Sequence, residues 1–372
     1  MSHLLTCAQS LINTILLLMP SSYQQKSLQT VIVLFLEATG RNVPQHATTV
    51  SASALSRFLN HYNWSCRAVI RAMRKEIKQQ LKARKIRGRR PTLKVILDMT
   101  SIEKTGKFKG LGTLMRVHNG TRGLHLVVLY IALGNWRLPW AFRVYRGKPN
   151  LSHIQLGLRL LKTLPATLTT SYQVLVLVDT AFGSIQFLES VRRLKFHAVA
   201  GIRCDRRLAN GGGVNQIKTR GQLVHLHGLS EPVTLSWYWV KRDNGTRQKR
   251  YVVSTKPYSW SYISRLGKQR WAIEAFFKTV KHRFSLHCFG QKTLLGVYRF
   301  LVLSMIAYIL AHWAALWSNR SSKPDWGQAA LLAAENLFPL PVLSALIIKI
   351  RRLRGLARQN GLELVIQGWQ YG

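Results

Sequence analysis

The sequence predicts an α/β fold in which a mixed β-sheet with flanking helices follows a helical N-terminal region. Three patterns favour this fold class. Apolar residues recur at helical spacing through residues 1–85, between proline and polar breaks. From Pro91 onward, β-branched runs alternate with helical segments, as they do in α/β layers. Residues 203–256 then join Gly-rich turns to alternating apolar runs, which indicates a β-rich insertion.

The elements follow from these patterns in chain order. Four helices are expected first, at residues 10–19, 27–39, 51–62 and 65–85. Strands are then expected at residues 92–100, 123–134, 136–147, 174–178 and 197–202. The later helices are expected at residues 150–164, 184–196, 262–284 and 298–317. Because proline cannot donate a hydrogen bond, Pro139 places its strand at an edge of the sheet.

The charge of the chain is extreme. It holds 55 Lys+Arg against 13 Asp+Glu, a formal net charge of +42, yet 47% of its residues are hydrophobic. Self-repulsion on this scale disfavours a compact state unless a polyanion or bound counterions offset it. The basic clusters at 71–90 and 348–358 are separated by apolar sequence, so the chain is a folded basic protein and not a neutral protein with a basic tail. We therefore expect nucleic acid as the partner, with an anionic membrane surface as the alternative.

Two further features bear on location and binding. Cys7, Cys66, Cys204 and Cys288 lie far apart without a CxxC pair, which argues against a zinc module or a disulfide framework and favours the reducing cytoplasm. The helices at 51–62 and 65–85 suggest a helix-turn-helix-like reader of DNA, although their spacing alone does not specify one.

One segment, residues 298–317, is long and apolar enough to span a bilayer. It contains Arg299 and His312, and it stands almost alone at this hydrophobicity. We interpret it as the buried helix of a large core, with a membrane-spanning helix as the alternative, and we expect no membrane partner.

Two aspartates directly follow strands that look buried. Asp98 ends the run VILD and Asp179 ends the run LVLVD. A carboxylate at such a place is unfavourable unless it is paired or bound to a cation. Each could pair with one of the many arginines. A pair on neighbouring strands, joined by a third carboxylate, is instead what two divalent cations require, because it offers hard oxygen ligands with open positions for water and phosphate.

Glu274 lies between basic residues on the predicted helix 262–284. Arg270, Glu274, Lys278 and Lys281 follow one another at spacings of four, four and three, so their side chains share one helical face. Alone, this pattern is typical of an ion-pair ladder on a solvated surface. Beside two strand-end aspartates, it suggests a third carboxylate flanked by cations.

This arrangement resembles the DDE transposases, most closely the IS4-type superfamily of bacterial insertion sequences. The superfamily signature reads Tyr, two residues, Arg, three residues, Glu, six residues, Lys, and its last three members match Arg270, Glu274 and Lys281 in register. Gly267 stands at the tyrosine position. One contact of the family is therefore missing or supplied by another residue, for which Tyr262 is a candidate.

The resemblance implies a ribonuclease-H-like catalytic core and a set of site residues. The catalytic residues would be Asp98, Asp179 and Glu274, which would hold two Mg²⁺ ions that Mn²⁺ can replace. DNA phosphates would be bound by Arg270, Lys278 and Lys281. In relatives, tryptophans of the β insertion hold a flipped base when the end is cut through a hairpin, and the candidates here are Trp237, Trp239 and Trp260. Strand tryptophans are more often packing residues.

The resemblance also gives each segment an expected role. The segments are a helical DNA-binding domain (1–90), the first part of the core (91–202), the β-rich insertion (203–257), the second part of the core (258–318) and a basic helical C-terminal segment (319–372). The expected activity is cleavage at the ends of an insertion sequence and joining of the 3′-OH ends to target DNA, by a homodimer on transposon-end and target DNA. The alternatives are a catalytically silent DNA-binding protein derived from such an enzyme and a basic membrane-associated protein.

Overall fold

The computed structural model describes residues 3–37, 44–83, 90–105, 110–241, 244–318 and 325–365. The chain divides into two compact units, one of Met1–Glu76 with Thr279–Gly372 and the other of Ile77–Lys278. The ends of the predicted helices 27–39 and 65–85, and both ends of the predicted segment 319–372, lie outside the described residues.

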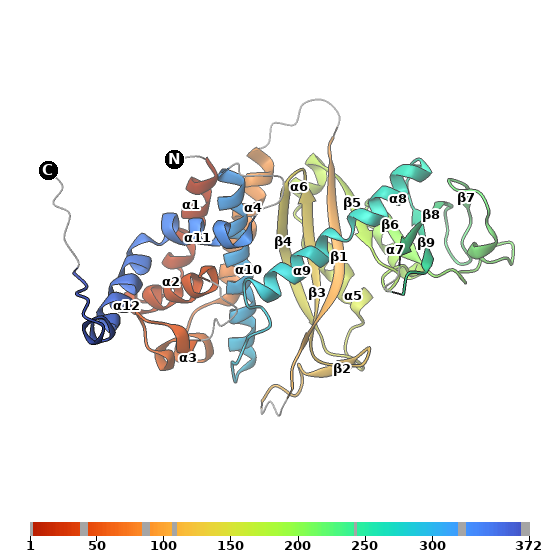
Figure 1. Cartoon of the computed structure of the whole chain (residues 1–372). Coiled ribbons are helices and arrows are strands. Elements are labelled where there is room, and N and C mark those ends of the chain that lie inside the picture. The colour runs from red at the N-terminus through yellow and green to blue at the C-terminus, as the bar shows by residue number, and fades with distance from the viewer. Residues whose placement is uncertain are drawn as a thin grey trace. The chain divides into compact units, whose positions relative to one another are not determined.

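The unit Ile77–Lys278 is built on one mixed sheet with flanking helices (Figure 1). Its strands run in the order β2-β3-β1-β5-β6-β9-β8-β7, and β4 pairs with β3. Strands β1, β5 and β6 are parallel, and the other pairs are antiparallel. Their bounds are β1 Thr92–Glu103, β2 Arg116–His118, β3 Thr121–Leu133, β4 Trp136–Tyr145, β5 Gln173–Val178, β6 His197–Ile202, β7 Leu223–Val224, β8 Val233–Lys241 and β9 Arg247–Ser254. The sheet confirms the expected mixed α/β fold with flanking helices.

The predicted β-rich insertion is not a separate sheet. Its strands β8 and β9 form a hairpin, and β9 pairs with β6, so the insertion extends the core sheet. Pro139 lies in β4, which pairs only with β3 among the described strands and therefore forms an edge, as predicted.

Helices cover both faces of the sheet, as the alternation of side chains along β1 demonstrates. Leu97 points toward helix α5, where a Cβ on Gly157 would meet its side chain. Ile96 points to the other face, where it lines a pocket with residues of the α8–α9 junction. The helices of this unit are α5 His153–Leu161, α6 Ala166–Ser171, α7 Ile185–Arg193, α8 Trp260–Gln269 and α9 Ala272–His282, the last of which continues into the other unit.

The structure corrects two predicted boundaries that matter for the site. Strand β1 does not end at Asp98 but runs on to Glu103, because β3 remains paired with it as far as Gly123. The single helix predicted at 262–284 is two helices, α8 and α9, separated at Arg270 and Trp271. The spacing of Arg270 and Glu274 survives this break, since the two side chains still pair across one turn.

The other unit is helical. Its described helices are α1 His3–Leu17, α2 Ser22–Leu36, η1 Pro44–His46, α3 Ala52–Asn60, α4 Cys66–Ala83, α10 Leu294–Trp317, α11 Trp326–Leu337 and α12 Pro339–Gln359, and α4 continues into the sheet unit. Helix α10 packs against α1, α2, α3 and α11. The N-terminal region is therefore helical, as predicted.

Helix α10 contains the segment that is long and apolar enough to cross a membrane, and 83% of its most apolar window is buried inside the protein. Its one buried cation explains why an arginine can lie in such a helix. The guanidinium of Arg299 donates to the carbonyl oxygens of Phe58, Leu59, Tyr62 and Trp64 and lies 4.1 Å from the ring centre of Trp64. These contacts favour the interpretation of α10 as a core helix.

Candidate active site

Two parallel strands bring Asp98 and Asp179 side by side, at the point where the pairing of these strands ends. The parallel pairing of β1 with β5 ends at Leu97 and Val178, so the two aspartates are the next residues in register. Although β1 continues, its parallel neighbour stops here, and the carboxyl end of a parallel strand is where open α/β sheets place their sites. The prediction that these two carboxylates are neighbours agrees with this register.

The loop after β5 holds Asp179 in one orientation. Its Oδ1 accepts hydrogen bonds from the backbone N–H groups of Ala181 and Phe182, at 3.0 and 3.3 Å. This tight loop lies against β6, where a Cβ on Gly201 would come within 2.9 Å of the backbone nitrogen of Thr180. Gly201 therefore permits an approach of backbones that any side chain would prevent.

Arg270 joins the first aspartate to the glutamate. Its Nη1 donates to Oδ2 of Asp98 at 2.8 Å, and its Nη2 donates to Oε1 of Glu274 at 2.9 Å. The Asp98 side chain is 13% exposed and that of Glu274 is 55% exposed, so the bridge runs from the buried edge of the sheet to the surface. The other oxygen of Asp98 accepts the N–H of Met99 at 2.8 Å.

The surroundings of Asp98 oppose its ionisation. Burial and the neighbouring charge of Asp179 raise the pKa of Asp98 to about 7, while Arg270 and the Met99 N–H act in the opposite direction and Glu274 adds a smaller increase. The carboxylate of Asp98 is therefore close enough to those of Asp179 and Glu274 to be repelled by both. A carboxyl group whose pKa is raised by burial and by a neighbouring charge is a candidate for a functional role.

Helix α9 presents Glu274 because its opposite side is anchored on the sheet. Ile273 and Phe276 are buried, and the Phe276 ring stacks on Tyr130 of β3 with 4.8 Å between ring centres. Lys278 is exposed one turn beyond Glu274, and Lys281 is half-buried nearly a turn further on. Burial lowers the pKa of Lys281.

The donor set suits a divalent cation, but its present arrangement does not hold one. Among the residues that the structure describes, no three His, Cys, Asp or Glu side chains converge closely enough to bind a metal ion. Asp98, Asp179 and Glu274 offer the hard oxygen ligands that Mg²⁺ prefers, and their repulsion would be relieved by a cation. Arg270 already lies between two of the three and provides part of that positive charge.

The structure explains why glycine stands at position 267, the tyrosine position of the signature. A Cβ at this residue would lie 2.8 Å from the Tyr238 ring and 3.1 Å from Val252. Tyr238 of β8 therefore fills the space beside α8 that a side chain at 267 would need. Its charged neighbours include Arg270 and Glu274, although burial is the main cause that raises the pKa of Tyr238.

Tyr238 is the residue near the site that the sequence analysis missed. The candidate named there, Tyr262, packs edge-on against Tyr258 at 4.8 Å and lies under the guanidinium of Arg265. The alternation along β8 could have pointed to Tyr238, because it predicts that this ring and Trp237 face opposite sides of the strand. It could not have shown that α8 crosses the sheet at that point.

The three candidate tryptophans, two in β8 and one at the start of α8, differ in exposure. Trp237 is buried in β8, where it packs on Tyr251, and Lys249 lies 3.9 Å from its ring centre. Trp239 and Trp260 are 52% and 47% exposed. Only these two among the three present enough ring surface for a base to stack on.

Comparisons with known proteins bear on the family. Residues 89–310 match the family described as "Transposase DDE domain", and this range includes the two aspartates and Glu274. A search of the curated proteins found no match. A cryo-EM structure of a piggyBac transposase synaptic complex with hairpin DNA is similar over 99% of this chain and 84% of that chain, with 11% identity and a TM-score of 0.48. Because the family match spans more than half of the residues, the chain belongs to the transposase DDE domain family.

Proposed function

We propose that the protein is the transposase of a bacterial insertion sequence of the IS4 type. It would cut DNA at the ends of its element and join the freed 3′-OH ends to target DNA. The observation that carries this proposal is the bridge that Arg270 makes between Asp98 and Glu274, with Asp179 following the neighbouring parallel strand, within a chain of the transposase DDE family.

In this proposal the three carboxylates hold two Mg²⁺ ions. Asp98 and Asp179 contribute oxygens from adjacent parallel strands, and Glu274 contributes one from α9. Bound divalent ions would activate the attacking oxygen and stabilise the leaving oxygen of an in-line displacement at phosphorus. Because the oxygens used by Arg270 are among the ligands, its guanidinium must leave them when the ions bind.

A DNA phosphate would then be the new partner of Arg270. A guanidinium released from two carboxylates beside a DNA phosphate can bind that phosphate in the same two-pronged manner. Lys278 and Lys281 follow on α9 and would bind neighbouring phosphates as point charges. The cations of this helix would thereby fix the position of the strand that the carboxylates cut.

The remaining parts of the proposal concern the partners. Transposon-end DNA would bind the N-terminal helices and the β insertion, and target DNA would enter afterwards. Two ends must be cut together, so we expect a homodimer on DNA in the cytoplasm, at the nucleoid. Of the candidate base-stacking residues, the exposure of Trp239 and Trp260 supports them over Trp237.

Strand cleavage by amide variants tests the proposal. The substrate is a duplex that carries the inverted repeat found beside the coding region, incubated with Mg²⁺. We expect Asp98→Asn, Asp179→Asn and Glu274→Gln each to abolish nicking and to retain end binding in a gel-shift assay. Glu103→Gln, an exposed carboxylate on the same strand as Asp98, is the matched control and should cut normally. Nicking by the three variants would refute the site, and binding without cutting by the wild type would identify a catalytically silent relative.

A further inference from the structure

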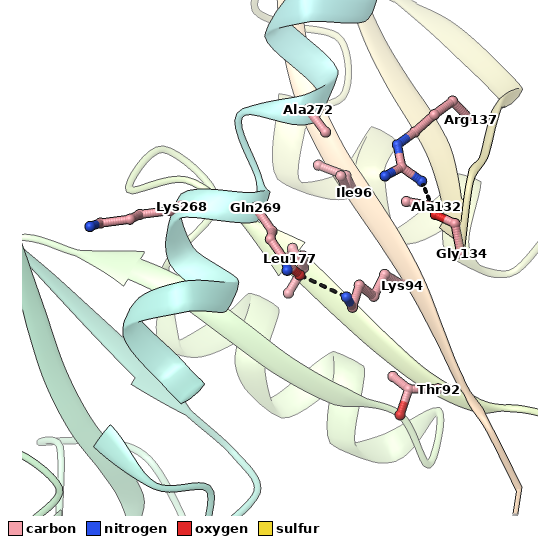
Figure 2. Close-up of a pocket in the computed structure, with 10 residues that line it drawn as sticks. All are labelled: Thr92, Lys94, Ile96, Ala132, Gly134, Arg137, Leu177, Lys268, Gln269 and Ala272. Carbon is pink, nitrogen blue, oxygen red and sulfur yellow. Dashed lines mark hydrogen bonds between the residues drawn. The ribbon is translucent and has the colours of Figure 1, made fainter. Parts of the chain in front are cut away.

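A positively charged pocket lies between β1 and the α8–α9 junction (Figure 2). Its volume is about 350 Å³, and β1, the β3–β4 turn and the α8–α9 junction line it. Its described lining includes the three cations Lys94, Arg137 and Lys268, and no carboxylate. A pocket of this composition in a chain with a net charge of +42 favours an anion.

The alternation of β1 fixes the position of the pocket relative to the active site. Lys94, Ile96 and Asp98 point to one face of the sheet, and Leu97 points to the other. At a rise of roughly 3.3 Å per residue, Lys94 lies about 13 Å along the strand from Asp98. Because the phosphates of one DNA strand follow one another every few ångströms, the pocket lies within a few nucleotides of a phosphate held at Asp98.

Lys94 is the central cation of the pocket. It is half-buried, and its Nζ donates to Oε1 of Gln269 at 2.7 Å (Figure 2). Burial lowers the pKa of Lys94, and the neighbouring charges of Arg137 and Arg265 lower it further. A neutral amide oxygen is a weaker partner for an ammonium group than an anion would be.

Arg137 faces Lys94 from the other side of the pocket. Its Nη1 donates to the carbonyl oxygens of Gly134 and Trp136, at 2.7 and 2.8 Å, which fixes the guanidinium at the β3–β4 turn. Lys268 extends from the exposed side of α8 at the rim. The cations therefore come from three separate elements, and the lining that surrounds them contains no carboxylate, a composition that a bound phosphate would suit.

We propose that this pocket binds a backbone phosphate of the DNA strand whose neighbouring phosphate is cut at the carboxylates. The identity of that strand rests on the proposed function, whereas binding of a DNA phosphate by Lys94 and Arg137 does not require cleavage. The site gives the enzyme a fixed contact a few nucleotides from the reaction, which sets the register of the strand.

Binding in the pocket also affects the active site. A phosphate at Lys94 replaces Gln269 as the partner of its ammonium group, and Gln269 is the last residue of α8. The next residue is Arg270, which bridges Asp98 and Glu274. DNA in the pocket therefore loosens the α8–α9 junction at the point where Arg270 must turn from carboxylates to phosphate.

Site-resolved acetylation tests the proposal. The intact protein is treated with a lysine-acetylating reagent in EDTA, alone, with a duplex oligonucleotide, or with inorganic phosphate at the same total phosphate concentration, and each lysine is quantified by mass spectrometry. We expect the duplex to slow acetylation of Lys94 several-fold. Lys162, exposed at the end of α5, is the control, because α5 lies on the opposite face of the sheet. Unchanged reactivity of Lys94 overturns the proposal, and equal protection by inorganic phosphate overturns its assignment to DNA.

Variants provide a second, independent measurement. Loss of one phosphate contact in Lys94→Met should reduce the slope of log affinity against log salt by about 0.9 and weaken duplex binding roughly tenfold. Lys94→Arg keeps the charge and should retain the slope, as should Lys162→Met. A slope in Lys94→Met equal to that of the wild type overturns the proposal. If Lys94→Met does not fold, protection of the wild-type lysine decides the question.

The two proposals can fail separately. Both measurements are made without metal, so protection of Lys94 in a protein that never cuts DNA would support the pocket and refute the enzyme. Cleavage of DNA without protection of Lys94 would support the enzyme and refute the pocket.

Discussion

Removing the charge of Asp98 should stabilise the metal-free protein. The pKa of Asp98 rises from 3.8 to about 7 on folding, mainly because of burial and Asp179. Between these values the folded state keeps a proton that the unfolded state has lost, so stability is full below about pH 4 and falls as the pH rises to about 7. The Asp98→Asn variant carries a neutral group of the same shape and avoids this loss.

The size of the effect follows from the pKa difference. About three pKa units at 1.36 kcal/mol each give about 4 kcal/mol in favour of Asp98→Asn at pH 8, and nothing below pH 4. For a unit of this length, about 4 kcal/mol corresponds to an increase of roughly 10 °C in Tm.

Thermal unfolding in EDTA from pH 4 to pH 8 measures this difference in stability between Asp98→Asn and the wild type. The control is Glu103→Gln, which removes an exposed charge from the same strand and should follow the wild type at every pH. Added Mg²⁺ should raise the Tm of the wild type and leave Asp98→Asn unchanged, because the variant has lost a ligand. A variant that is no more stable than the wild type at pH 8, or whose advantage does not change with pH, would refute the reasoning.

Three other substitutions have defined outcomes. Gly267→Ala should cost about 1–3 kcal/mol in unfolding free energy, because its Cβ would lie 2.8 Å from a packed ring, whereas Gly112→Ala meets nothing within 4 Å and should be neutral. Arg299→Met should cost about 3–5 kcal/mol, because it leaves buried carbonyl oxygens without donors. Trp239→Ala should weaken binding of single-stranded or flipped bases by about 1–3 kcal/mol without loss of stability, whereas Trp237→Ala should lower the Tm.

Each of these has a result that would contradict it. Denaturant unfolding of Arg299→Met should be compared with Arg67→Met, an exposed arginine of the same unit, and equal losses would show that the buried contacts contribute little. An unperturbed Gly267→Ala would mean that the Tyr238 ring moves freely. Equal DNA affinity of Trp239→Ala and the wild type would exclude stacking on that ring.

Local patterns were sufficient to predict the elements that carry the carboxylates. The run VLVLV predicted β5 because a strand buried on both faces is continuously apolar, and Asp179 follows it in the structure. The spacing of Arg270 and Glu274 predicted their ion pair, because residues four apart are neighbours on a helix. Both predictions depend only on residues close in the chain.

The errors arose where distant elements meet. Asp98 was expected to end its strand, yet β1 continues because β3, paired by a hairpin with β4, is longer than the parallel neighbour β5. The break between α8 and α9 and the ring of Tyr238 against Gly267 depend on how α8 crosses the insertion hairpin. No periodicity in a single segment encodes such a crossing.

Arg299 is another residue whose partners could not be predicted from the sequence. In the sequence it counted against a membrane-spanning helix, since a charge in an apolar environment is unfavourable unless it is paired. The structure pairs it with carbonyl groups at the end of α3 and in the turn before α4, which are neutral and therefore do not appear in any count of acidic partners. Backbone oxygens therefore supply the partners that a buried arginine requires.

The bridge made by Arg270 connects the charge of the whole chain to the proposed chemistry. Three carboxylates that repel one another need positive charge to stay together, and in the metal-free protein part of it comes from Arg270. A metal ion that displaced the guanidinium alone would leave an unpaired cation in a chain that already carries a net charge of +42, which electrostatics disfavours. A DNA phosphate removes that obstacle, because it accepts the displaced guanidinium. In the proposed enzyme, metal loading and substrate binding would therefore be coupled, and the carboxylates would gain their full set of ions when there is a strand to cut.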